Sequence, residues 1–284
     1  MVEEETKKIM AALSTLNPTQ LRVLTHSILN LSCHHLHRLS SILSSPSLFS
    51  LTIHHLISLS PSSKSLLIAR HLLSLLRLLL LHFHPQDRPH LSSGPPAIKL
   101  RDLDAVLLLL FICETHHHHP QTLLAGDPSE WRESLSKTFS HAMLSNLSEI
   151  GGYNGGVLIT YAETVSRCLR FVRMVDSCSG GRMERKEAAA SPATVVGLPT
   201  VEVSGGGVGL EYCTVCKEEM REGREVCELP CKHLFHWKCI LPWLKKKNTC
   251  PCCRFQLPTD DVFEEIQRLW EVLIRAGGGG SFDF

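Results

Sequence analysis

A short stretch near the end of the chain holds most of the side chains that could do chemistry. Residues 213–253 carry eight of the twelve cysteines together with two histidines. Six of these cysteines and both histidines form short-spaced pairs: Cys213, Cys216, Cys231, His233, His236, Cys239, Cys250 and Cys253. Thiolate sulfur and imidazole nitrogen are the ligands of structural zinc, which takes four and closes its shell. The eight residues therefore predict two zinc sites with no open position at which the metal could activate water.

The composition limits what the rest of the chain can be. At 284 residues with 43% apolar side chains, it is long enough for one large or two modest folded domains. A net charge of +1 gives no field that attracts a phosphate backbone, so we expect no binding to nucleic acid. The first residues, MVEEETKKIM, lack the charged-then-apolar pattern of a secretory signal, so we expect no cleaved targeting segment. In a reducing compartment, clustered Cys-x2-Cys pairs indicate metal binding over disulfides.

The ligand spacing resembles that of the RING domain family in its two-histidine form. In that family the metals are held in a cross-brace, in which alternate pairs of ligands share a site. The resemblance implies two structural zinc ions, the first held by Cys213, Cys216, His236 and Cys239 and the second by Cys231, His233, Cys250 and Cys253. A module of about 45 residues is too small for a sufficient apolar core, so zinc binding would supply much of its folding free energy.

Two further cysteines, Cys227 and Cys252, fit this spacing less well. Cys252 could be a ligand in a shifted register, but Cys250 with Cys253 keeps the two-residue gap. Cys231 is favoured over Cys227 because it stands one residue before a histidine of the pattern. We expect both extra cysteines to be small, buried or half-buried thiols.

Four residues beside the ligands match positions at which the family contacts its partners. Val215, Trp243 and Pro251 correspond to the apolar groove that docks a ubiquitin-conjugating enzyme. Arg254 corresponds to the linchpin cation, which bonds both that enzyme and ubiquitin and holds the reactive thioester in a folded-back geometry. The resemblance implies a RING-type ubiquitin-protein ligase that promotes direct transfer of ubiquitin to lysines of an unknown protein substrate. Such a ligase acts by proximity and forms no thioester of its own.

Each of these residues also has a plainer interpretation. Val215 and Trp243 could belong to the core, Pro251 could form a turn and Arg254 could be a solvated charge, while Phe235 is expected in the core. The module would then be a non-catalytic, zinc-dependent interaction scaffold, which an autoubiquitination assay separates from a ligase. A chromatin-reading PHD finger is disfavoured because it would place its single histidine and its tryptophan differently.

The first part of the chain predicts a helical domain over residues 1–177. Three segments open with a capping residue before a proline, at Asn17, Ser45 and Ser60, and proline suits the first turn of a helix. A fourth start, at Asp127, is followed three residues later by the glutamate of a capping box. The likeness of these segments could record an internal repeat, although helices of this kind look alike for physical reasons. We expect about six helices.

Two apolar stretches in this domain raise the question of a membrane span. Residues 66–83 include Arg70, His71 and Arg77, which a span disfavours. Residues 103–113 supply about half of the apolar residues that a span needs. We therefore expect buried or amphipathic helices at both places.

The remainder of the chain predicts several smaller parts. Residues 178–210 are rich in Gly, Ser, Ala and Pro and predict a flexible linker. Residues 211–258 would form the RING zinc finger, for which the family implies a short β hairpin plus a helix. Residues 259–275 predict a C-terminal amphipathic helix, and residues 276–284 a disordered tail. The expected fold class is thus a mostly α N-terminal domain, a flexible linker, a small zinc-stapled cross-brace RING module and an amphipathic helix.

Two further stretches resemble one plant branch of the RING ligases. LPTDD follows the last ligands, and TLNPTQL opens a helical half that is rich in Leu, Ser and His. The branch is associated with amyloplasts and shoot gravitropism, which implies that the helical half targets the protein or recruits its substrate. Without a transit peptide, the implied location is peripheral, on the cytosolic face of the plastid.

Overall fold

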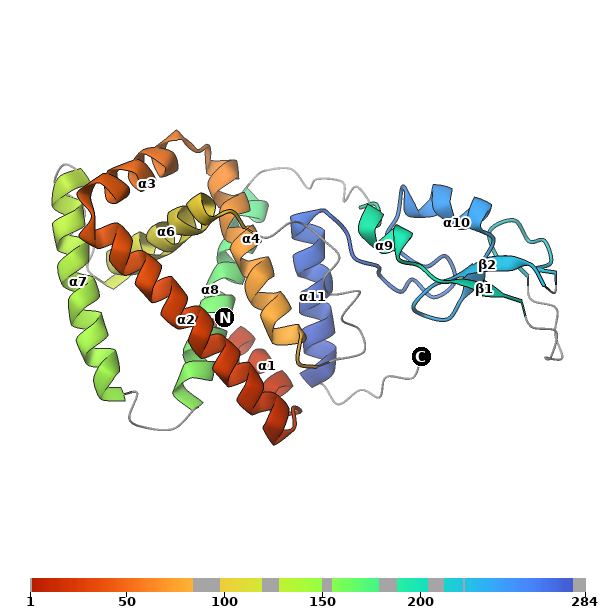
Figure 1. Ribbon diagram of the computed structural model, residues 1–284, viewed down its shortest axis with the longest axis horizontal. Coiled ribbons are helices and arrows are strands. Elements are labelled where there is room, and N and C mark those ends of the chain that lie inside the picture. Colours follow the sequence, from red (N-terminus) through yellow and green to blue (C-terminus); the bar gives the residue numbers. More distant parts are fainter. Residues whose placement is uncertain are drawn as a thin grey trace. The chain divides into compact units, whose positions relative to one another are not determined.

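The protein divides into two compact units (Figure 1). The structure, a computed structural model, describes residues 2–83, 98–118, 128–149, 155–178, 188–203, 212–221 and 223–277. The first unit comprises residues 1–82 and 97–179 and is built from helices; the second comprises residues 83–96 and 180–284 and holds the cysteine-rich segment.

Seven helices among the described residues make up the first unit, close to the number expected. They are α1 Val2–Leu13, α2 Pro18–Ser44, α3 Pro46–Ser58, α4 Pro61–Leu80, α6 Leu100–His118, α7 Pro128–Glu149 and α8 Gly155–Cys178. The two apolar stretches fall on α4 and α6, as expected. Within the part of the chain that the structure describes, no helix is both long and apolar enough to cross a membrane.

The predicted helix starts, in which a capping residue is followed by a proline, are confirmed at three of the four positions. Asn17 and Gln20 form a complete capping box, with the Gln20 N–H donating to Asn17 Oδ1 at 2.8 Å and the Asn17 N–H donating to Gln20 Oε1 at 3.1 Å. The hydroxyl oxygens of Ser45 and Ser60 each accept a backbone N–H from the first turn of α3 and α4. These bonds satisfy N–H groups that have no partner inside the helix. The fourth position, Asp127, lies outside the described residues.

Helix α4 lies in the middle of the first unit. It contacts α2, α6 and α8, and its apolar side chains recur at intervals of three and four residues. Ile68, Leu72, Leu76 and Leu79 are fully buried. Helix α8 packs on both α1 and α4, so these apolar faces form one core that joins the first and last helices of the unit.

Polar side chains also tie the helices together. Arg38 of α2 donates to both carboxylate oxygens of Asp104 of α6, at 3.0 Å and 2.6 Å, and Asp104 is buried. The buried Tyr161 hydroxyl of α8 donates to the carbonyl of Leu75 in α4 at 3.0 Å. Because buried polar groups are costly without partners, these bonds select one packing of the helices.

Two histidine rings meet between α2 and α4, of which His71 is buried and His35 is half-buried. The ring centroids of His35 and His71 lie 5.3 Å apart. Burial lowers the pKa of His71 to about 3 and that of His35 to about 4, with a smaller effect from a neighbouring histidine in each case. Both rings are therefore neutral at neutral pH in the folded unit.

Among its described residues, the second unit contains a small sheet and three helices. Strands β1 Thr200–Glu202, β2 Glu225–Glu228 and β3 Leu234–Phe235 form an antiparallel sheet in that order. The helices are α9 Pro192–Val196, α10 Trp237–Leu244 and α11 Val262–Gly277. The β2–β3 hairpin and α10 are the hairpin and helix that the RING resemblance implied. Phe235 is fully buried in the core of this unit, as expected.

Residues 188–203 depart from the predicted flexible linker, because they are folded against the cysteine-rich segment. The backbone N–H of Ala190 donates to the carbonyl of Leu244, and that of Ser191 donates to the carbonyl of Pro258. Helix α9 follows, and β1 then pairs with β2. The expectation of a flexible segment is thus wrong for residues 188–203, since their hydrogen bonds and buried side chains belong to the core of the second unit.

The C-terminal helix α11 starts at a network of hydrogen bonds. Asp261 Oδ1 accepts the backbone N–H groups of Phe263 and Glu264, which caps the helix. Glu265, fully buried, accepts the Thr259 backbone N–H at 3.2 Å and two bonds from Arg268, at 2.8 Å and 2.6 Å. Most of the predicted apolar face is buried, but Phe263, which was expected on it, is exposed. The network fixes the first turns of α11 on the segment that follows the last cysteine.

Candidate functional site

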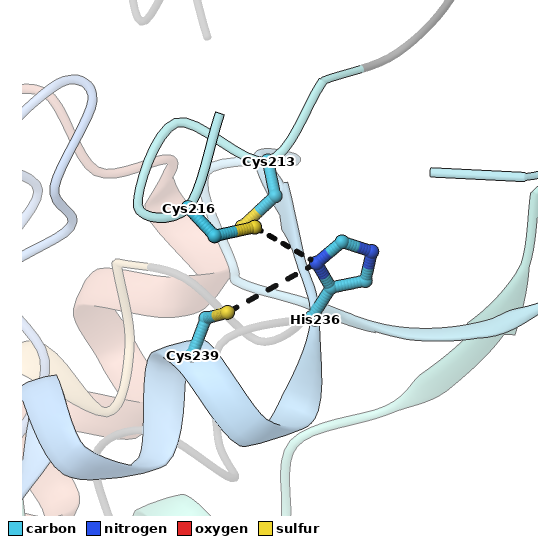
Figure 2. Close-up of side chains that lie close together, drawn as sticks. All are labelled: Cys213, Cys216, His236 and Cys239. Atoms are coloured by element: carbon cyan, nitrogen blue, oxygen red, sulfur yellow. Dashed lines mark hydrogen bonds between the residues drawn. The ribbon is translucent and has the colours of Figure 1, made fainter. Parts of the chain in front are cut away.

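The first group of ligand candidates brings two distant parts of the segment together. The Sγ atoms of Cys213, Cys216 and Cys239 and a ring nitrogen of His236 all lie within 4.8 Å of one another. Figure 2 shows the three sulfurs and the imidazole converging on one point. His236 Nδ1 lies 3.4 Å from Cys216 Sγ and 4.0 Å from Cys239 Sγ. This is the set of four that the RING resemblance assigned to one zinc ion.

The second group has the same form and alternates with the first along the chain. Ligand atoms of Cys231, His233, Cys250 and Cys253 all lie within 4.8 Å of one another. His233 Nδ1 is 3.4 Å from Cys231 Sγ. The ligand pairs of the two groups interleave, so the geometry is the cross-brace that the resemblance implied.

The donor sets fit tetrahedral zinc. A zinc ion bonded to sulfur at about 2.3 Å and to nitrogen at about 2.0 Å holds these atoms roughly 3.5 Å apart. The nitrogen–sulfur distances of 3.4 Å and 4.0 Å bracket that value. Each group consists of three thiols and one imidazole, a common structural zinc set, and each would be closed by four protein ligands.

Tight backbone turns place these ligands. Lys217, Lys232 and Arg254 have φ values of 61°, 64° and 62°, and each stands one residue after a cysteine of the two groups. A left-handed residue reverses the chain and turns amide groups toward the preceding sulfur. The Lys217 N–H donates to the Cys213 carbonyl, and the Arg254 N–H donates to the Cys250 carbonyl, which closes both Cys-x2-Cys turns.

The electrostatic surroundings of the thiols differ within each group. Burial raises the pKa of Cys213 and of Cys253, but neighbouring backbone N–H groups and thiols outweigh it, and the pKa of each lies below its ordinary value. Burial, with neighbouring thiols, raises the pKa of Cys231 and Cys239 to about 12. Within each group, one thiol therefore loses its proton more easily than another, and a bound cation would favour the deprotonated form of every ligand thiol.

The two remaining cysteines of the segment differ from each other. Cys227 is fully buried on β2, as expected, and burial raises its pKa to about 12. Cys252 is exposed, which contradicts the expectation of a buried or half-buried thiol. It lies in the turn between Cys250 and Cys253, whose ligand atoms face the second group, so the intervening side chain faces outward. Its Sγ lies 3.2 Å from the hydroxyl oxygen of Thr214.

The residues predicted to contact partners lie around two hydrogen bonds that the sequence did not reveal. The Thr214–Cys252 contact joins the turn that carries Val215 to the turn that carries Pro251. The Trp243 indole N–H donates to the Thr249 carbonyl at 2.8 Å, which holds the ring beside the second turn. A threonine inside one Cys-x2-Cys turn is the sequence signal for the first contact.

The exposure of these residues separates them from the core. Val215 is 39% exposed, whereas the apolar core residues of the unit are buried. Trp243 and Pro251 are half-buried, and Lys247 Nζ lies 5.0 Å from the centre of the indole ring. Arg254 is exposed, and its side chain makes no hydrogen bond or ion pair with the described residues.

Comparison with known proteins places both groups of ligand candidates in one domain. The ring finger domain model matches residues 211–254. Over 97% of its length the chain is 55% identical to "E3 ubiquitin-protein ligase SGR9, amyloplastic" of Arabidopsis thaliana, 98% of which is covered. The Drosophila melanogaster RNF181 homolog, an E3 ubiquitin-protein ligase, is 44% identical over 38% of this chain and 74% of its own. The Rattus norvegicus RNF181 ligase is 50% identical over 28% of this chain and 48% of its own.

The extent of these matches separates the two units. The animal relatives align over 110 and 80 residues, fewer than the second unit contains, whereas the Arabidopsis relative matches nearly the whole of each chain and so includes both units. From the interleaved Cys/His groups, the ring finger match and this full-length likeness, it follows that the chain belongs to the family of RING-type E3 ubiquitin-protein ligases.

Proposed function

We propose that this ligase docks a ubiquitin-conjugating enzyme on Val215, Trp243 and Pro251, and that Arg254 restrains the ubiquitin which that enzyme carries. The observation that carries the proposal is a pair of contacts around these residues, between Thr214 and Cys252 and between the Trp243 indole and the Thr249 carbonyl. Through them, two Cys-x2-Cys turns and an indole ring hold exposed apolar surface in one place. Exposed apolar side chains on rigid turns suit an interface, because little conformational freedom is lost on binding.

Two zinc ions are part of this proposal, one in each group of ligand candidates. When bound, zinc supplies folding free energy and fixes the turns. The protein's own side chains carry the interactions with partners. Without zinc, nothing would hold the three thiols and one imidazole of each site together. The apolar core of the module is too small to keep it folded by itself.

Arg254 is suited to act on ubiquitin because its guanidinium is exposed and has no partner among the described residues. A guanidinium offers five N–H donors in a planar arrangement, which can bond carbonyl oxygens on two partner proteins at once. Each added bond narrows the positions open to the thioester and leaves the folded-back geometry favoured. A lysine of the protein substrate then attacks the thioester carbonyl, and the sulfur of the conjugating enzyme leaves.

The experiment that tests this role is single-turnover discharge of ubiquitin from a loaded conjugating enzyme to free lysine. We expect Arg254→Ala to reduce the rate by about tenfold or more, because charge-assisted hydrogen bonds are lost in the reactive geometry. Arg224→Ala removes an exposed arginine of the same unit and serves as the control. Arg254→Asn is a second variant, since asparagine tolerates the left-handed backbone at this position.

The outcome also separates a ligase from a scaffold. Val215→Ala should weaken binding of the conjugating enzyme while leaving the zinc content unchanged. Full discharge activity in a folded Arg254→Ala protein would show that the linchpin assignment is wrong. If the wild-type protein discharges no conjugating enzyme of a broad panel, the non-catalytic scaffold is the better interpretation.

The helical unit is proposed to place the ligase at the plastid. The proposal is supported by the match to the Arabidopsis relative, whose name includes the word amyloplastic and which aligns with this unit as well. The animal relatives align with a much smaller part of this chain. We propose peripheral association with the cytosolic face and a role in gravitropism, with the protein substrate unknown. Protease added to intact isolated amyloplasts should then degrade the protein. Protection until the envelope is lysed would indicate import.

A further inference from the structure

The second unit contains a cavity between its cysteine-rich segment and its C-terminal helix. The cavity has a volume of about 520 Å³, and Cys231, His233 and Cys253 of the second group of ligand candidates form part of its lining. Arg254 and Phe255 line it from one side, and Arg268, Val272 and Arg275 of α11 line it from the other. The three α11 residues are spaced four and three apart, so they share one face of the helix.

The α11 side of the cavity is held in a fixed position. Glu265 bonds both the Thr259 backbone N–H and the Arg268 guanidinium in a buried network. The preceding residues are tied to the rest of the unit, because Asn248 and Leu257 exchange hydrogen bonds. A surface that is already ordered costs little conformational entropy when a partner binds.

The charges around the cavity are unevenly neutralised. Arg268 is paired with the buried Glu265, so its charge is balanced within the protein. Arg275 has a side chain that is 68% exposed and an ion pair with Glu271 at 3.4 Å, a solvent-exposed pair of the kind that contributes little. With Arg254 on the opposite side, the cavity presents two guanidinium groups with donors to spare. Such a surface fits a partner that offers carboxylate and carbonyl oxygens.

We propose that this face of α11 is a second contact surface for the ubiquitin carried by the conjugating enzyme, with Arg275 as a positioning residue. The inference rests on the proposed function, because it takes its partner from Arg254. Val215, Trp243 and Pro251, the proposed contacts to the conjugating enzyme, do not line the cavity. The cavity therefore continues the surface on the ubiquitin side of Arg254 and lies apart from the docking residues.

The proposal gives α11 a distinct effect on binding. A contact to ubiquitin strengthens the affinity for the loaded conjugating enzyme and leaves the affinity for the unloaded enzyme unchanged. It also adds to the interactions that hold the thioester folded back, so discharge becomes faster. Because the contact is between exposed charges, both effects should shrink as salt is raised.

The test compares Arg275→Glu with Arg224→Glu in the full chain. Arg224 is an exposed arginine of the same unit that does not line the cavity. Affinities are measured for the unloaded conjugating enzyme and for a stable ubiquitin conjugate of it, together with discharge rates. For Arg275→Glu we expect about three- to tenfold weaker binding of the conjugate and similarly slower discharge, with unchanged binding of the unloaded enzyme. Arg275→Gln should give a smaller loss, and Arg224→Glu none.

The outcomes distinguish this inference from the proposed function. If Arg254→Ala abolishes discharge but Arg275→Glu and Arg275→Gln match the wild type, the α11 contact is refuted and the proposed function stands. If Arg275→Glu weakens binding of the loaded and unloaded enzymes equally, α11 contacts the conjugating enzyme and the inference is likewise refuted. If the wild-type protein has no discharge activity, the proposed function itself fails.

Discussion

Removing the buried carboxylate of Glu265 should destabilise the attachment of α11. Glu265 is fully buried, and the Arg268 side chain is 9% exposed, so solvent screens this ion pair very little. In Glu265→Ala the guanidinium stays buried without its partner, which typically costs about 3–5 kcal/mol. The buried Thr259 N–H also loses its acceptor, a loss of about 1–3 kcal/mol when water does not replace it. Because both losses share one site, we expect a total of about 4 kcal/mol.

Hydrogen exchange of the peptides that cover residues 257–277 measures this loss, since it reports local opening. Glu265→Ala should speed exchange there by about a thousandfold if α11 opens as a unit. Glu271→Ala is the matched control on the same helix, and it should change exchange less than about threefold because its ion pair is partly exposed.

The double variant Glu265→Leu/Arg268→Met decides whether the buried charge is the cause. It removes both charges and fills the space with apolar atoms, so most of the lost stability should return. Two results would refute the reasoning: a single variant that exchanges like the wild type, or a double variant that is as unstable as the single one.

The remaining predictions concern zinc, pH and the extent of the second unit. Cys231→Ser should lower the bound zinc measured by elemental analysis and unfold the unit, whereas Cys252→Ser should keep both. Since burial lowers the pKa of His71, the unfolded chain binds the proton first; its contribution to stability is complete above about pH 6.5 and falls as the pH drops toward 3, by roughly 1.4 kcal/mol per pH unit, and His35 adds a similar loss down to about pH 4. Urea unfolding followed by circular dichroism should show this slope, and His71→Leu should reduce it. Fragment 188–277 should be more stable than fragment 211–277 by about 4 kcal/mol in denaturant unfolding, because the shorter one lacks the buried side chains of the folded extension.

For each of these predictions, one result would contradict it. Loss of zinc from Cys252→Ser would favour the shifted ligand register. A pH slope that His71→Leu leaves unchanged would place the titrating group elsewhere. Equal stability of the two fragments would mean that residues 188–203 add no net free energy to the unit.

The sequence predicted those features whose signals are local. Asn17, Ser45 and Ser60 cap helices because each cap depends on the few residues that follow it. The grouping of the Cys/His ligands came from the family resemblance, since spacing alone indicates two sites without saying which pairs share a metal. The domain boundaries at residues 177 and 210 stay predictions.

The features that were missed depend on pairings between distant residues. Residues 188–203 read as a linker because the whole segment 178–210 is rich in Gly, Ser, Ala and Pro, while β1 acquires its structure from β2, more than twenty residues later. One signal was present: Ser191 before Pro192 repeats the pattern that marked three earlier helices, and its hydroxyl caps α9. The Glu265–Arg268 pair was missed because both charges lie on the buried side of α11, where an amphipathic pattern expects apolar residues.

Because the ligand groups interleave, folding of the module should depend on the zinc concentration in a threshold manner. One group closes the chain between residues 213 and 239, and the other closes it between residues 231 and 253, so the two loops overlap. Filling either site shortens the free chain that the other must close, which lowers the entropy cost of the second closure. Molecules with a single metal should therefore be rare. As available zinc declines, the population would divide between fully folded and unfolded modules, and ligase activity would switch off over a narrow range of concentration.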